Sequence, residues 1–212
     1  MSRFFRTRTL FADKPYLSVL VAACLTGLLS ACSGNAALQR QQYDFGLPAT
    51  PAVGSVSARL QVGLADIQVV PVLDNNAMWY RLQYDNAQQL KAYAQARWSM
   101  PPAQLLSQRL KMQLLASGTQ LVSASDGIAA QPVLHIELDE FSQVFTTSTN
   151  SHAQINVRAV LSKGKAIVAQ RSFSVQSPSK TADAPGGARA MQEASDALIS
   201  EMQQWLNHLA AI

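Results

Sequence analysis

The strongest constraint on the fold is the hydrophobic period between Val133 and Val175. Apolar and polar residues alternate there one by one over three successive stretches. Such alternation puts apolar side chains on one face of a strand and polar ones on the other. We predict an antiparallel meander with one buried and one wet face. Its inward residues are Leu134, Ile136, Leu138, Ile155, Val157, Ala159, Leu161, Ile167, Ala169, Phe173 and Val175.

The wet face of this meander has two further predictable features. The alternation slips at Asp139-Glu140, which indicates a β-bulge. The hairpin register sets Glu137 beside Arg158, or beside Asn156 if it is shifted by two residues.

The rest of the domain is predicted as two strands, two helices and a terminal helix. Strands over 59–70 and 77–83 flank the turn sequence LDNNA, and helical spacing in NAQQLKAYAQARW predicts a helix over 86–98. A second helix begins at Pro101 or Pro102 and closes at Gly118. The order ββααβββα favours a single α+β domain over 59–212, with a largely antiparallel or mixed sheet and helices packed on one face.

The chain ends in an amphipathic helix opened by TADAPGG, with Asp183 as the expected N-cap. An apolar stripe at steps of three and four is typical of a helix lying on a sheet. The stripe consists of Ala188, Met191, Ala194, Leu198, Met202, Trp205, Leu206 and Leu209.

The N-terminus reads as a lipoprotein signal peptide over 1–31. Four basic residues precede an apolar segment over 16–29, which is shorter than the roughly 20 residues that a membrane span needs. Leu29-Ser30-Ala31-Cys32 has the pattern that lipoprotein signal peptidases cut, so we expect Cys32 to begin the mature chain with a diacylglyceryl thioether and an acylated amine. A rival cleavage before Cys24 and an uncleaved anchor with a buried Cys32 are the alternatives.

Removal of 1–31 changes the bulk properties. The segment holds four of the 17 Lys+Arg and one of the 13 Asp+Glu, which leaves 13 basic and 12 acidic residues. Most of the net positive charge therefore lies in the targeting segment, and it gives no support to nucleic-acid binding. Residues 32–58 read as an acylated N-terminus and flexible tether, part of which docks. Ser33, where Asp would favour the inner membrane, points to the periplasmic face of the outer membrane.

The sequence offers no catalytic motif. It lacks a G-x-S-x-G elbow, a phosphate loop and a Gly-rich dinucleotide turn. His135, Glu137 and Asp139 share one strand face, but same-face side chains lie about 7 Å apart, which does not suit a metal ion. We expect no enzyme, no cofactor and no metal. A Ser/His/Asp set assembled from distant residues, including His152 and His208, stays open as an alternative.

Four residues are candidate partner contacts. Trp79 and Arg81 would share one strand face in MWYRL, and Arg97 and Trp98 precede the pair Pro101-Pro102. Aromatic and Arg side chains are enriched at interface anchors. The alternative is that the Trp residues are core and that the Pro pair only restarts a helix.

Several of these segments together resemble one family. They are the lipobox at Cys32, QQYDFGLP, IQVVPVLDNNAMWYRLQ, YAQARWSMPP and TADAPGGARAMQEASDAL. The chain resembles the ABC-type transport auxiliary lipoproteins, the PqiC-like outer-membrane lipoproteins that accompany MCE-domain lipid transport systems. Tyr43, Arg97, Trp98 and Pro102 match pattern positions without an assigned role.

The resemblance implies a non-enzymatic component that binds the MCE protein at the outer membrane, with Cys32 as the acylation site. A homo-oligomer stays possible. The alternatives are a periplasmic lipid carrier that holds an acyl chain between the terminal helix and the sheet, and a hydrolase.

Overall fold

The predicted meander forms the centre of the fold. The computed structural model describes residues 40–47, 61–122 and 132–210. In it β7 (Val133–Phe145), β8 (Ser151–Lys163) and β9 (Ala166–Pro178) are antiparallel neighbours. The predicted bulge lies between Leu138 and Glu140, and Glu137 faces Arg158, so the first of the two registers is confirmed.

One inward residue of the meander was predicted wrongly. Ile167 is 66% exposed. A register shift between Leu161 and Ser162 makes Ser162 the partner of Ile167. Ser162 lies on the wet face, where it is bonded to His135, so Ile167 is turned to that face as well.

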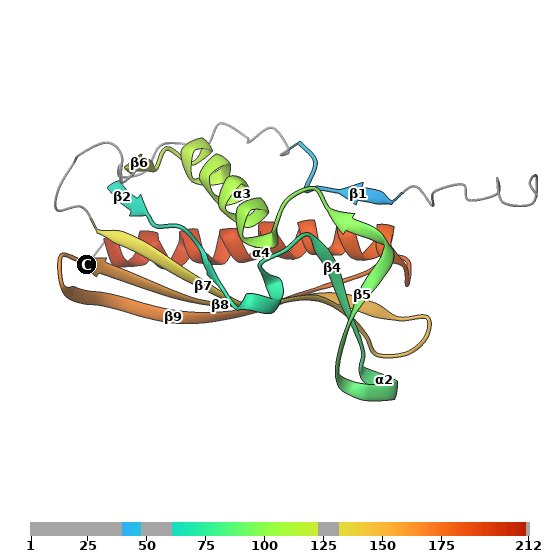
Figure 1. Cartoon of the computed structure of the whole chain (residues 1–212). Helices are drawn as coiled ribbons and strands as arrows, with labels where there is room; N and C mark the ends of the chain where they lie inside the picture. Colours follow the sequence, from blue (N-terminus) through green and yellow to red (C-terminus); the bar gives the residue numbers. More distant parts are fainter. Residues whose placement is uncertain (1–39, 48–60, 123–131, 211–212) are drawn as a thin grey trace, which may run out of the picture. The chain divides into compact units, whose positions relative to one another are not determined.

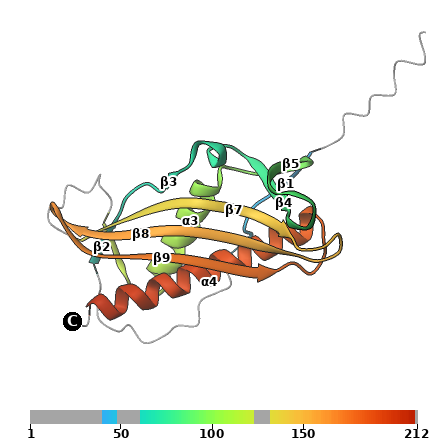
Figure 2. The ribbon, with the colours of Figure 1, turned by 90° about the horizontal axis from the view of Figure 1, so that it is seen from below.

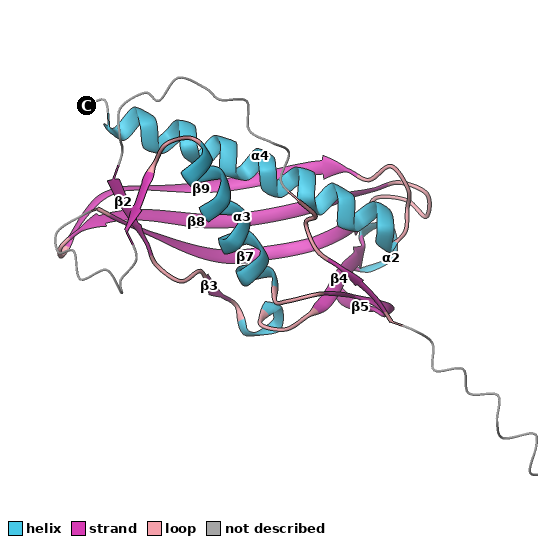
Figure 3. Cartoon of the chain, turned by 90° about the horizontal axis from the view of Figure 1, so that it is seen from above, coloured by secondary structure: helices cyan, strands magenta, loops and turns pink. Residues whose placement is uncertain are grey.

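Helix α4 (Ala184–Ala210) covers the inner face of the meander (Figure 3). Its 27 residues make a rod of about 40 Å, and a strand of 13 residues spans about 43 Å, so one helix matches the length of the sheet. The predicted stripe is buried except for Leu209, which is half-buried. Trp205 meets Phe173 of β9 edge-on with 5.9 Å between ring centroids.

The first turn of α4 explains the sequence TADAPGG. Asp183 is the N-cap, as predicted, since its Oδ1 accepts a hydrogen bond from the Gly186 amide at 2.8 Å. A Cβ on Gly186 would lie 2.1 Å from the carbonyl oxygen of Thr181. A Cβ on Gly187 would lie 1.9 Å from Oε1 of Gln143. The two glycines therefore let the helix approach its own entry loop and the sheet.

Gln143, on β7, is fixed in this place by a buried polar network. Its Oε1 accepts from the Tyr93 hydroxyl at 2.9 Å, and its Nε2 donates to Ser151 Oγ at 2.8 Å. Burial, followed by the charges of Tyr80 and Asp183, raises the pKa of Tyr93. The phenol therefore stays protonated and keeps its role as donor to Gln143.

Shorter strands extend the sheet beyond β7, in the order β1-β5-β4-β7-β2-β6. Three of them, β2 (Gln61–Leu64), β3 (Gln68–Val69) and β4 (Ala77–Leu82), run one after another in parallel along β7, with the short helix η1 (Pro71–Leu73) before β4. The strand predicted over 59–70 is thus divided in two within its described part. β6 (Gln120–Val122), which was not predicted, pairs with β2.

The helix predicted over 86–98 is wrong. Apart from the four-residue α2 (Gln83–Asn86), this region is β5 (Ala87–Trp98), which pairs antiparallel with β4. Leu90 and Tyr93 fit a helical spacing, but Ala96 and Trp98 are its buried residues, and they share one strand face. Tertiary pairing therefore overrides a weak helical pattern. The α+β class with a mixed sheet is nevertheless confirmed (Figure 1).

Part of the expected tether docks. β1 (Gln41–Tyr43) pairs in parallel with the end of β5, and Phe45 behind it is 4% exposed. Phe45 packs edge-on against Trp98, and both rings contact Phe141 of β7. The part of the expected tether that packs on the domain therefore begins at Gln41.

Helix α3 (Pro102–Ala116) begins at the predicted Pro pair and is followed by Gly118 with φ 83°. None of the helices in the described ranges is long and apolar enough to span a membrane. α3 and α4 are joined by a charge pair. Arg109, 2% exposed, donates from Nε and Nη2 to the two carboxylate oxygens of Asp196, each at 2.7 Å.

This pair yields a stability prediction. We expect Asp196→Ala to lower the free energy of unfolding by about 3 kcal/mol, because it leaves the Arg109 charge buried and unpaired. We expect the double change Arg109→Met with Asp196→Leu to stay within about 1 kcal/mol of the wild type, because it removes both charges. Urea unfolding measures both.

The matched control is Glu201→Ala, an exposed carboxylate on the same helix, for which about 0.5 kcal/mol or less is expected. A loss for Asp196→Ala no greater than that of the control would contradict the assigned role of the pair.

Candidate partner-binding surface

The helices lie on one face of the meander and leave its other face open (Figure 2). Outward side chains of β8 and β9 form a neutral hydrogen-bonded ladder on this open face. Gln176 donates to Gln154 at 2.7 Å, Gln154 donates to Ser174 at 3.1 Å, and Ser174 donates to Asn156 at 2.9 Å. The ladder satisfies its own polar groups while keeping them at the surface, which suits contact with a polar partner.

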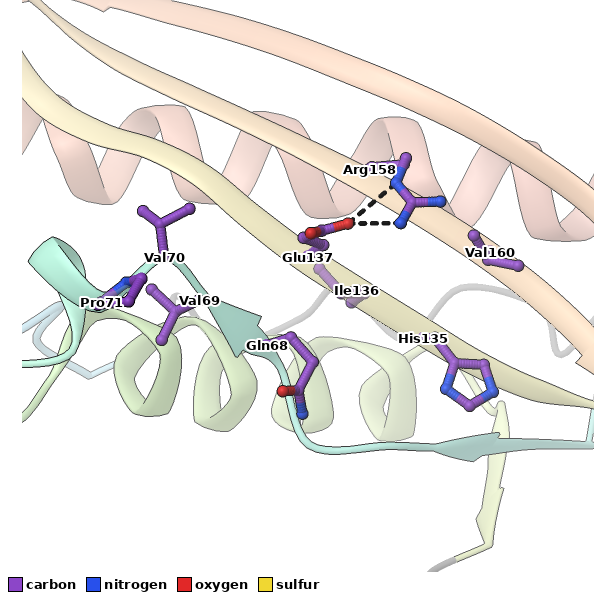
Figure 4. Close-up of a pocket in the computed structure, with 9 residues that line it drawn as sticks. All are labelled: Gln68, Val69, Val70, Pro71, His135, Ile136, Glu137, Arg158 and Val160. Carbon is purple, nitrogen blue, oxygen red and sulfur yellow. Dashed lines mark hydrogen bonds and ion pairs between the residues drawn. The ribbon is translucent and has the colours of Figure 1, made fainter.

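A shallow groove of about 490 Å³ runs along the open face beside β3 and η1 (Figure 4). Glu137 and Arg158 lie on its wall, where Arg158 donates from Nε at 3.0 Å and from Nη2 at 2.5 Å to Oε2 of Glu137. The other lining residues are Gln68, Val69, Val70, Pro71, His135, Ile136 and Val160. Both charges are about half-exposed, so the groove offers a charge pair at its rim and apolar groups at its side.

A second groove of about 270 Å³ lies near the other end of β7, around Arg81 and Glu140. Arg81 Nη2 donates to Glu140 Oε2 at 3.0 Å, and the two side chains are 27% and 19% exposed. His152 also lines this groove, and its burial lowers the pKa of the imidazole below the usual range. His152 is therefore neutral at neutral pH.

The three histidines do not converge on one site. His135 is on β7, His152 on β8 and His208 on α4. His135 Nε2 lies 3.0 Å from Ser162 Oγ, which is the geometry of a Ser–His pair. Its neighbour Glu137 is bonded to Arg158 instead, so this carboxylate does not orient the imidazole. Within the described ranges no group of three His, Cys, Asp or Glu residues is placed to hold a metal ion.

The structure separates the four candidate contact residues. Trp98 is 1% exposed within the Phe45–Phe141 cluster, so its assignment as a partner contact is wrong, and the core alternative is correct. Arg97 is half-buried and reaches Gln42 of β1. With the Gln42 amide assigned from its hydrogen bonding, its oxygen accepts from Nη2 at 2.6 Å and from Nε at 3.1 Å. Arg97 thus fastens the tether to the sheet.

Trp79 and Arg81 remain as surface candidates. They are two residues apart on β4 and both half-buried, so they share one strand face, as the sequence indicates. Arg81 lies at the second groove. The indole Nε1 of Trp79 is buried and has no hydrogen-bond partner among the described residues.

The sequence analysis did not predict the hydrogen-bonded ladder on the open face. Gln154, Asn156, Ser174 and Gln176 are common residue types in a wet strand face and form no recognisable motif. Only their cross-strand register, with Gln154 opposite Gln176 and Asn156 opposite Ser174, brings them into one ladder.

With this geometry established, the family can be stated. The family of ABC-type transport auxiliary lipoprotein components matches residues 43–203. The chain belongs to this family, as the sequence resemblance indicated. The match runs from the end of β1 into α4 and ends at residue 203.

Solved structures share the fold. Protein XCC0632 from Xanthomonas campestris is 21% identical with a TM-score of 0.69, and the alignment covers 81% of this chain and 97% of that one. The hypothetical protein CT253 from Chlamydia trachomatis is 12% identical with a TM-score of 0.50, over 73% and 100% of the two chains. At these identities the likeness concerns the fold alone. A search of the curated proteins finds no match.

Proposed function

We propose that this protein is a lipid-anchored, non-enzymatic component of an MCE/ABC-type envelope lipid transport system, held at the periplasmic face of the outer membrane, where it docks the MCE protein. The observation that carries the proposal is the match to the transport auxiliary lipoprotein family over 43–203. The lipobox at Cys32 and the following Ser33 supply the anchor and its membrane.

The open face of the sheet is the proposed docking surface. β8 runs along this face for about 40 Å, and its outward side chains are polar apart from Val160. The face carries two shallow grooves, each with a charge pair, and Arg81 lines the second of them. Trp79 lies two residues before Arg81 on the same strand face. Arg and Trp are residue types that often dominate the binding energy of an interface.

The lipid-carrier alternative needs space between α4 and the sheet. The side chains that face each other there are densely buried. Ala194 and Leu198 of α4 are 0% exposed, and so are Ala153, Ile155 and Ala159 of β8. An acyl chain could enter only by displacing this packing, which costs more than filling a preformed cavity. Docking is therefore the better supported function.

The anchor can be tested by substitution of Cys32. We expect Cys32→Ser to abolish incorporation of labelled palmitate and to move the protein from the outer-membrane fraction out of it, because the thioether cannot form. The matched control is Cys24→Ser, which destroys the rival lipobox and should leave labelling and fractionation unchanged. Labelling that is lost in Cys24→Ser and kept in Cys32→Ser would contradict the proposal.

Docking through the open face can be tested by substitution of Arg81. We expect Arg81→Ala to reduce the amount of MCE protein that co-purifies with the chain about tenfold, equivalent to about 1.4 kcal/mol. The control is Arg189→Ala, an exposed arginine on α4, away from the open face, which should leave recovery unchanged. Equal recovery with both variants, each checked for a normal unfolding curve, would contradict docking through this face.

A further inference from the structure

The turn between β8 and β9 exposes six residues in a row, Lys163–Val168. It lies at the end of the meander opposite to β1 (Figure 1). Two of the six are large aliphatic residues and neighbours in sequence, with Ile167 66% exposed and Val168 52% exposed. Single exposed apolar residues are common on protein surfaces, but an adjacent pair flanked by charges is a candidate contact site.

A β-bulge turns this aliphatic pair outward. Ala169 pairs with Leu161, and Ile167 pairs with Ser162, so Val168 is an extra residue on β9 between the two pairs. In a regular ladder Ile167 would share the inward face of Ala169, because the two are two residues apart. The bulge instead brings Ile167 beside Ser162 on the wet face. The fold therefore exposes an aliphatic side chain that a regular strand would turn inward.

The same hairpin is cationic. From Phe141 to Ala182 the chain has five Lys or Arg residues and no Asp or Glu. The rest of the expected mature chain, by contrast, holds eight basic and twelve acidic residues. One of the five cations is paired with Glu137, but within the described ranges no ion pair involves Lys163 or Lys165. The end of the hairpin therefore presents two uncompensated positive charges beside the aliphatic pair.

We propose that the end of the β8–β9 hairpin binds the surface of a membrane that contains anionic phospholipids. Lys163 and Lys165 contact the lipid phosphates, and Ile167 with Val168 enters the boundary between headgroups and acyl chains. Each lysine near an anionic surface strengthens binding about fivefold. The proposal goes beyond docking of a partner through the open face, and it does not depend on the acyl anchor.

The composition of the hairpin end fits a lipid surface better than a protein partner. Lys is depleted at protein–protein interfaces, where Arg and aromatic residues are enriched. Residues 162–170 contain two Lys but neither Arg nor an aromatic residue. Neither of the two grooves described above reaches the turn, so these grooves do not provide a recess for a protein side chain there. Aliphatic side chains flanked by lysines are the combination that binds at the membrane–water interface.

The experiment uses the expected mature chain, residues 32–212, with Cys32→Ser, so that neither the acyl group nor the signal segment contributes to binding. Ile167→Cys then supplies the only thiol, which carries the fluorophore NBD. Its emission shifts to the blue in an apolar environment. The control carries NBD at Val72→Cys, on an aliphatic residue of η1 that is 46% exposed.

Both labelled proteins are mixed with two kinds of vesicle, one of phosphatidylcholine alone and one of equal amounts of phosphatidylglycerol and phosphatidylcholine. We expect a blue shift from Ile167→Cys with the anionic vesicles and none with phosphatidylcholine alone. The label at Val72→Cys should not shift with either vesicle. This comparison tests whether the hairpin end is the part of the domain that enters the lipid.

The contribution of the lysines is measured by vesicle flotation of the unlabelled chain. We expect Lys163→Gln with Lys165→Gln to weaken binding to the anionic vesicles about 25-fold, because two favourable charges are removed. The matched control is Lys111→Gln with Lys180→Gln, two exposed lysines outside the hairpin. It makes the same change in net charge and should alter binding by about twofold or less, because charges away from the membrane are screened.

The absence of a shift from Ile167→Cys on anionic vesicles, or an equal shift from Val72→Cys, would overturn the proposal. So would equal losses of affinity in the two lysine pairs, since attraction would then follow the net charge alone. Lost recovery of the MCE protein in the Lys163 and Lys165 variant, without vesicle binding by the wild type, would make the hairpin a protein contact and also overturn it. None of these results changes the palmitate labelling of Cys32, so failure of this proposal is distinguishable from failure of the proposed anchor.

Discussion

The structure depends on the burial of one long apolar sheet face under one helix. β7, β8 and β9 each have 13 residues and turn an apolar face to the same side. Leaving such a face in water would cost about 25 cal/mol for each Å² of apolar surface. α4 covers it along its full length, and the Asp183 cap and the close approach at Gly186 and Gly187 fix where the helix begins. With both long helices on this side, the other face remains available for contact.

The parts of the fold that follow local rules could be predicted from the sequence. The period of two predicted the meander and its bulge, and the spacing of three and four predicted α4. Pro102 and Asp183 predicted where the two long helices begin. β5 could not be predicted because Leu90 and Tyr93, three residues apart, favour a helical period, and only Ala96 and Trp98 at its end keep the period of two. Its strand state is decided by pairing with β4, which is not encoded within the segment.

The candidate site was predicted less well for a related reason. Trp and Arg residues mark both interfaces and cores, and the sequence does not reveal which. Trp98 is core because Phe45, from the segment expected to be a tether, packs on it. Arg97 pairs with Gln42 of the same segment. Both outcomes depend on the docking of β1, a contact between parts of the chain more than 50 residues apart. Arg81, by contrast, shares a strand face with Trp79, as predicted, and lies at the second groove.

The family match supports the proposal of a transport auxiliary role, and the open face of the sheet is the surface we propose for it. The central claim is that the open face of the sheet meets the partner and that the helical face does not. The most direct measurement is photocrosslinking in intact cells, with a benzophenone amino acid at Gln154 on the open face or at Arg189 on α4. The account predicts a crosslink to the MCE protein from Gln154 and none from Arg189. A crosslink from Arg189 and none from Gln154 would contradict it.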